Sequence, residues 1–146
     1  MRTGLAAALA GLTALAAGCG GSGRLSHDAF VQRADAVCAA YDAQVQLLAK
    51  PSSYDDVITY VAKTLPLYIA AVDELKALRP PAADEETVRA WLAQEDAVAA
   101  ALRRLRKAAM QHDPAATNSA SATVQAASLA GRRAAAALGM SDCARP

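Results

Sequence analysis

The chain has 146 residues, of which 54% are hydrophobic and 20% are charged, and its formal net charge at pH 7 is +1. This balance lacks the excess of Lys and Arg that marks a nucleic-acid-binding surface. The length suffices for one domain with one core. Composition therefore excludes nucleic acid as an expected partner and leaves proteins, membranes and small ligands.

The first 18 residues have the pattern of a secretory signal. Arg2 gives a positive start, a run of Leu, Ala and Gly extends from Leu5 to Ala17, and small residues precede Cys19. The apolar run covers about 13 residues, whereas a helix needs roughly 20 to span a bilayer. We therefore expect residues 1–18 to be removed after export.

The segment Leu15-Ala16-Ala17-Gly18-Cys19 resembles the lipobox of bacterial lipoproteins. The resemblance implies that the Cys19 thiol receives a diacylglycerol and that Cys19 becomes the new N-terminus. This would anchor the protein to the extracytoplasmic face of the cell membrane. The pattern departs at Ala16, where Leu is commonest, and an ordinary secretion signal with a free Cys19 is the alternative interpretation.

Three cysteines are present, and an odd thiol in an exported protein needs an explanation. Lipidation of Cys19 supplies one and leaves Cys38 and Cys143, which should be oxidised to a disulfide outside the cytoplasm. Two unrelated buried thiols are the alternative. We expect residues 19–25 to form the lipidated cysteine and a flexible spacer, followed by a folded domain over residues 26–146.

Four segments show helical periodicity, with Ser26, Ser53 and Asp113 as N-caps and Gly139 at the last C-terminus. The predicted helices cover approximately residues 26–50, 54–78, 84–111 and 114–138. Short connections favour antiparallel neighbours. We therefore expect an all-α fold, an up-down-up-down four-helix bundle closed by one disulfide.

Pro66 lies in the middle of the second predicted helix. A mid-helix proline removes one hydrogen bond and bends the helix. On the helical wheel it lies about 140° from the centre of the apolar stripe, toward solvent. A gentle bend is the favoured interpretation, with a kink that opens a pocket, or a break into two shorter helices, as alternatives.

No constellation of catalytic or metal-binding residues is recognisable. The only histidines, His27 and His112, fall at opposite ends of parallel helices, so they cannot share an ion with a third ligand. The sequence contains neither a Gly-x-Ser-x-Gly elbow nor a phosphate-binding Gly loop. We therefore expect no enzyme activity, no catalytic residues, no cofactor and no metal.

Glu95 falls almost at the centre of the apolar face of the third helix, one turn after Trp91. A carboxyl group there must be paired, protonated or close to water. By helix level its expected partners are Tyr68 and Ser128, with Tyr41 one layer away. The carboxyl group either forms a buried hydrogen bond or reaches solvent at the edge of the bundle. Alternatively, it is the polar anchor of a ligand pocket whose walls are tyrosine and tryptophan side chains.

The chain also resembles small actinobacterial-type lipoproteins with an Ala-rich helical domain and a cysteine pair. This resemblance covers the whole chain, its one specific motif is the lipobox, and it implies an envelope location without a particular activity. The first expectation is a non-enzymatic interaction or structural module that meets an unknown envelope protein. The alternative is a binding module for a small apolar or amphipathic ligand between the helices. A cavity near Glu95 and Tyr68 would favour the alternative, and an exposed apolar patch including Leu47 and Leu129 would favour the protein partner.

Overall fold

The structure, a computed structural model, describes residues 23–146, so the predicted signal peptide and Cys19 lie outside the described residues. Within that range the chain forms helices and no strands, which confirms the all-helical prediction. None of these helices is both long and apolar enough to cross a membrane. The helices are α1 (His27–Val45), α2 (Tyr54–Ala77), α3 (Glu85–Met110) and α4 (Pro114–Ala137).

Local capping fixes most helix ends where the sequence predicts them. The side chains of Ser26, Ser53 and Asp113 each accept a hydrogen bond from the backbone N–H three residues later, as N-caps do. At the end of α4, Gly139 takes the left-handed conformation with φ of 83°. The N–H of Met140 then bonds back to the carbonyl of Ala135 at 3.1 Å, which turns the chain away from the helix axis.

The first helix is shorter than predicted, because it ends at Val45 and not near Lys50. Tighter turns follow, with the N–H of Leu48 bonded to the carbonyl of Val45 at 3.0 Å. Pro51 disfavours helical backbone at Lys50, the residue before it, which explains why the helix does not reach Lys50 but not why it ends at Val45. Apolar periodicity alone overestimated this end.

Pro66 is exposed, as predicted, and α2 runs through it without interruption. A break into two shorter helices, one of the alternatives, is therefore wrong. The proline costs one backbone hydrogen bond on the solvent side of the helix, where water can replace it.

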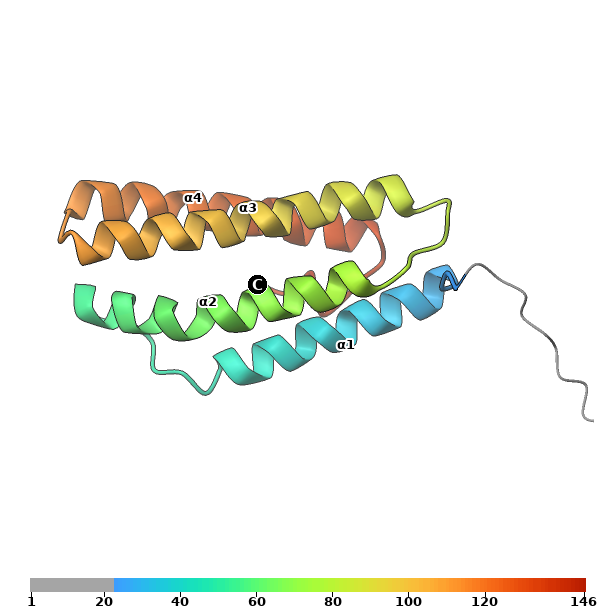
Figure 1. Cartoon of the computed structure of the whole chain (residues 1–146), viewed down its shortest axis with the longest axis horizontal. Coiled ribbons are helices and arrows are strands. Elements are labelled where there is room, and N and C mark those ends of the chain that lie inside the picture. Colours follow the sequence, from blue (N-terminus) through green and yellow to red (C-terminus); the bar gives the residue numbers. More distant parts are fainter. Residues whose placement is uncertain (1–22) are drawn as a thin grey trace, which may run out of the picture.

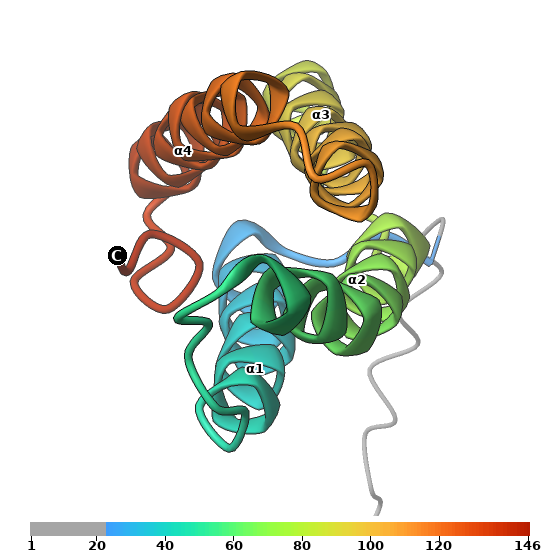
Figure 2. The same cartoon turned by 90° about the vertical axis from the view of Figure 1, so that its left-hand side faces the viewer.

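The helices pack in chain order, α1 on α2, α2 on α3 and α3 on α4 (Figure 1). In contrast, no Cα atom of α1 lies within 8 Å of a Cα atom of α4. The C-terminal segment, residues 139–146, lies between them, as the end-on view shows (Figure 2). We call this segment the strap. The helices thus form an open array whose gap the strap fills.

The main core lies toward the end of the array that holds the α2–α3 connection, which we call the strap end. Trp91 and Phe30 are its largest members, with 1% and 0% of their surface exposed. Every helix and the strap contribute to this cluster: Phe30, Ala34, Leu75, Val88, Trp91, Ala135, Leu138 and Met140. Toward the α3–α4 connection, at the distal end, most of the buried positions of α3 and α4 hold alanine: Ala99, Ala101, Ala108, Ala109 and Ala120.

Candidate functional site

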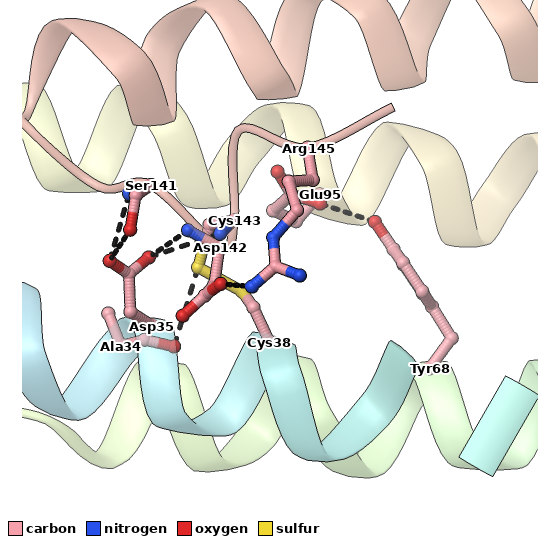
Figure 3. Close-up of a disulfide and its surroundings, with 9 residues drawn as sticks. All are labelled: Ala34, Asp35, Cys38, Tyr68, Glu95, Ser141, Asp142, Cys143 and Arg145. Carbon is pink, nitrogen blue, oxygen red and sulfur yellow. Dashed lines mark hydrogen bonds and ion pairs between the residues drawn. A yellow bond between two sulfur atoms is a disulfide. The ribbon is translucent and has the colours of Figure 1, made fainter. Parts of the chain in front are cut away.

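The strap is bound to α1 by a covalent bond and by one carboxylate. The Cys38–Cys143 disulfide is formed, which confirms the predicted pairing (Figure 3). One turn earlier on α1, Asp35 accepts hydrogen bonds from the backbone N–H groups of Ser141, Asp142 and Cys143 at 2.8, 2.8 and 3.1 Å. The Ser141 hydroxyl adds a further bond to the same carboxylate at 3.0 Å. Asp35 therefore fixes the strap backbone where it crosses α1.

Sequence reasoning did not identify Asp35 as a structural residue. Its donors lie 106 to 108 positions further along the chain, so no local pattern reveals the contact. The proximity of Asp35 to Cys38, three residues apart on one helix face, is the single sequence signal that relates it to the disulfide.

A cavity of about 330 Å³ lies between the helices next to the strap. Residues of all four helices and of the strap line it. At roughly 30 Å³ per water molecule this space equals about ten waters, and it falls within the range of small-molecule sites. All of the candidate pocket residues from the sequence line this one cavity: Tyr41, Tyr68, Trp91 and Glu95.

Glu95 is the acidic group that α3 places in the cavity. The Tyr68 hydroxyl donates a hydrogen bond to Oε2 of Glu95, as predicted from helix level (Figure 3). Ser128, the other expected partner, lines the cavity, but among residues 23–146 the hydrogen bond to Glu95 comes from Tyr68. The other oxygen, Oε1, faces the backbone of α4 at Gly131, where a Cβ atom would lie 2.5 Å from it. The absence of a side chain at Gly131 therefore gives the carboxyl group its place.

Burial dominates the electrostatics of this group and raises the pKa of Glu95 above its usual value. The hydrogen bond from Tyr68, the nearby indole of Trp91 and the charge of Arg132 oppose the shift without cancelling it. Burial also raises the pKa of both Tyr68 and Tyr41. Both phenols consequently stay protonated at physiological pH, and Tyr68 acts as a donor.

Trp91 contributes a hydrogen-bond donor that the protein leaves unused. Only 1% of the surface of this residue is exposed. Among the described residues, its Nε1 is the buried side-chain nitrogen or oxygen without a hydrogen-bond partner. It lies close enough to Glu95 to influence the carboxyl group but does not form a well-directed hydrogen bond with it. An unpaired buried donor costs free energy, because it loses its hydrogen bond to water on folding.

Aromatic rings form one wall of the cavity around the Glu95 carboxyl group. The rings of Tyr41 and Tyr68 meet edge to face, with centroids 5.4 Å apart and planes inclined by 75°. This is a favourable geometry for an aromatic pair. This aromatic pair connects α1 to α2 at the level of Glu95, about one helical turn along α1 from the disulfide.

The two histidines have separate neighbours. Nδ1 of His27 lies 2.7 Å from a carboxylate oxygen of Asp84, and His112 packs edge to face against Tyr54. Across residues 23–146, no group of three or more His, Cys, Asp or Glu side chains is arranged to hold a metal ion.

Comparisons of this chain with protein families, with curated proteins and with solved structures find no match.

Proposed function

We propose that this chain is a lipid-anchored, non-enzymatic protein of the bacterial cell envelope that binds a small apolar or amphipathic molecule between its helices. The observation that carries the proposal is the cavity of about 330 Å³ with Glu95 at its wall. Ligand sites combine mostly apolar walls with a few polar groups that fix orientation. Here Val72, Val98 and Leu102 supply apolar wall and Glu95 supplies the polar group.

The surface gives less support to a protein partner. Among residues 23–146, the exposed large hydrophobic side chains are Leu47, Met110 and Leu129, at 85%, 56% and 42% exposure. They lie on the α1–α2 connection, at the end of α3 and on α4, and so belong to different elements. Scattered apolar side chains are ordinary on a protein surface, whereas an interaction site needs a contiguous patch. The interior therefore favours a ligand over the interaction module that is the first expectation from the sequence.

The proposed location in the cell envelope rests on the lipobox resemblance at residues 15–19. We infer that Cys19 carries the lipid, that the protein faces the extracytoplasmic side of the membrane, and that the helices have up-down-up-down topology. Mass spectrometry of the mature N-terminal peptide tests the address. Diacylglycerol on Cys19 is the expected result, and an unmodified N-terminus at another residue would refute it.

Binding is tested with the full chain in dodecyl maltoside micelles and the apolar fluorescent probe N-phenyl-1-naphthylamine. Above the signal of empty micelles, emission should saturate at one probe per chain. Ala71 lines the cavity, whereas Ala70 is exposed on the same helix. Ala71→Phe should weaken binding at least about tenfold by filling space, and Ala70→Phe should leave it unchanged. No saturable emission, or equal binding by both variants, would refute the proposal.

A further inference from the structure

We propose that the polar wall of the cavity recognises an organic cation, a protonated amine or a quaternary ammonium group, through the Glu95 carboxylate and the rings of Tyr41, Tyr68 and Trp91. This inference rests on the proposed ligand-binding function and names the chemical class of the ligand. An alkyl substituent on the cation would occupy the apolar part of the cavity.

Glu95 lacks a counter-ion within the protein. An ionised carboxylate offers about four acceptor positions. The structure fills one of them, with the Tyr68 hydroxyl. Within residues 23–146, the ion pairs involve other carboxylates and leave Glu95 without a basic side chain within 4.0 Å. A partly buried carboxylate in this state is stabilised either by a proton or by a cation that enters from outside.

The cavity wall around Glu95 is rich in aromatic rings. Tyr41, Tyr68 and Trp91 line the same cavity as Glu95, and the two tyrosine rings are in contact. Aromatic faces attract ammonium groups within about 6 Å, and several rings around one position are the usual recognition site for quaternary ammonium. The phenols remain protonated, so these rings offer π faces without adding negative charge.

The charge balance of the cavity lining is negative. It contains one more acidic than basic side chain: Asp42, Glu95 and Asp142 against Arg132 and Arg145. Arg145 is paired with Asp142 on the strap, which removes both from the balance. Arg132 approaches Glu95 without forming an ion pair, so the remaining balance is two acidic groups, Asp42 and Glu95, against one basic group. The lining therefore favours a cation over an anion.

Occupation by a cation should depend on pH, because burial raises the pKa of Glu95 and protonation removes its charge. The cation should bind more weakly at pH 5 than at pH 8. Ionisable or charged groups line the cavity with this carboxyl: Tyr41 and Asp42 on α1, Tyr60 and Tyr68 on α2, Arg132 on α4, and Asp142 with Arg145 on the strap. Burial raises the pKa of Asp42 as well. Asp96, on the exposed side of α3, acts on Glu95 through its charge from outside the cavity. The phenols do not titrate in this interval, and Arg132 and Arg145 keep their charge.

The experiment compares three probes of similar length on the full chain in dodecyl maltoside at pH 8. The probes are hexyltrimethylammonium, 1-hexanol and hexanoate, which present a positive, a neutral and a negative head. Trp91 is the single tryptophan of the chain and lines the cavity, so its fluorescence reports binding directly. We expect hexyltrimethylammonium to bind at least about tenfold more tightly than 1-hexanol, and hexanoate to bind most weakly.

Two variants locate the preference. Glu95→Gln should abolish the preference for the ammonium probe and leave the affinity for 1-hexanol within about twofold. Asp96→Asn is the matched control, because Asp96 is the next residue, is exposed and pairs with Lys76 at 2.7 Å outside the cavity. It should retain the wild-type preference.

The outcomes separate this inference from the proposed function. Equal affinity for the three probes, or tightest binding of hexanoate, would refute the cation site while leaving a ligand-binding cavity. A preference that survives Glu95→Gln would also refute it. Failure of all three probes together with N-phenyl-1-naphthylamine would refute both the cation site and the binding function.

Discussion

The strap end and the distal end of the helical array are held together in different ways. At the strap end, large side chains such as Trp91 and Phe30 fill the interior, and a disulfide joins the strap to α1. At the distal end, most of the buried positions of α3 and α4 hold alanine, and α2 contributes Val61, Thr64 and Leu65. The first helix buries only Phe30 and Ala34, both in its first half, so its second half adds little to the distal core.

Because its buried residues lie in its first half, α1 is attached to the rest of the molecule mainly at one end. Large buried side chains contribute roughly 1.5 to 3 kcal/mol each through the hydrophobic effect, and an alanine contributes far less. The cavity lies between the two regions, where α1 and α4 separate and the strap takes the place of a direct helix contact. The stability of the site should consequently depend on the strap.

We expect the largest loss of stability from removal of the disulfide, which holds the strap to α1. A bridge with a sequence separation of 105 residues is worth about 4 to 5 kcal/mol when its effect is treated as loop entropy. Cys38→Ala combined with Cys143→Ala should therefore lower the free energy of unfolding by about that amount, measured by urea denaturation. A melting temperature that neither these substitutions nor a reductant changes would contradict the importance of the strap.

Truncation of core side chains at the two ends compares them directly. Phe30→Ala at the strap end should cost about 4 kcal/mol, because the side chain is completely buried. Leu65→Ala on the distal half of α2, where Leu65 is 8% exposed, should cost about 2 to 3 kcal/mol. Equal losses in urea denaturation, or a larger loss for Leu65, would show that the distal end is packed as strongly.

Local signals predicted most of the helices and part of the site. Ser53, Asp113 and Gly139 act within one helical turn, so their caps are visible in the sequence. The Tyr68–Glu95 contact followed from helix levels once short connections were assumed. The early end of α1 did not follow, because its apolar stripe continues to Leu48 beyond the last helical residue.

The strap position was beyond sequence reasoning for a physical reason. Alanine faces predict close approach of helices but not which helices approach, because small side chains fit many neighbours. The sequence therefore did not indicate that α1 and α4 stay apart. The role of Asp35 and the extent of the cavity both follow from that separation.

Asp35 provides a smaller test of the strap. Asp35→Ala removes the acceptor for three backbone N–H groups and should cost about 2 kcal/mol, the usual range for bonds to a charged group. Hydrogen exchange at residues 141–143 should accelerate in the variant. Asp73→Ala, at an exposed position of α2, should change neither quantity. Unchanged exchange in Asp35→Ala would mean that other contacts hold the strap.

Glu95→Gln gives the smallest expected effect and depends on pH. Because burial raises the pKa of Glu95, its contribution favours the folded state below the unfolded pKa and is lost as pH rises through the folded pKa. The neutral amide avoids this loss, so the variant should be about 1 kcal/mol more stable at pH 8 and equal to the wild type at pH 4. Thermal unfolding at both values measures it. A variant less stable at pH 8 would mean that the carboxylate is better compensated than its contacts suggest.

The Cys38–Cys143 bond also has a mechanical consequence. Between these residues the backbone is a closed covalent ring that contains the end of α1 and the three later helices. A load applied between the two ends of the chain passes through the bond and cannot unravel the ring. From His27 to Cys38 only about a dozen residues can be drawn out, which limits the extension of this segment to about 40 Å.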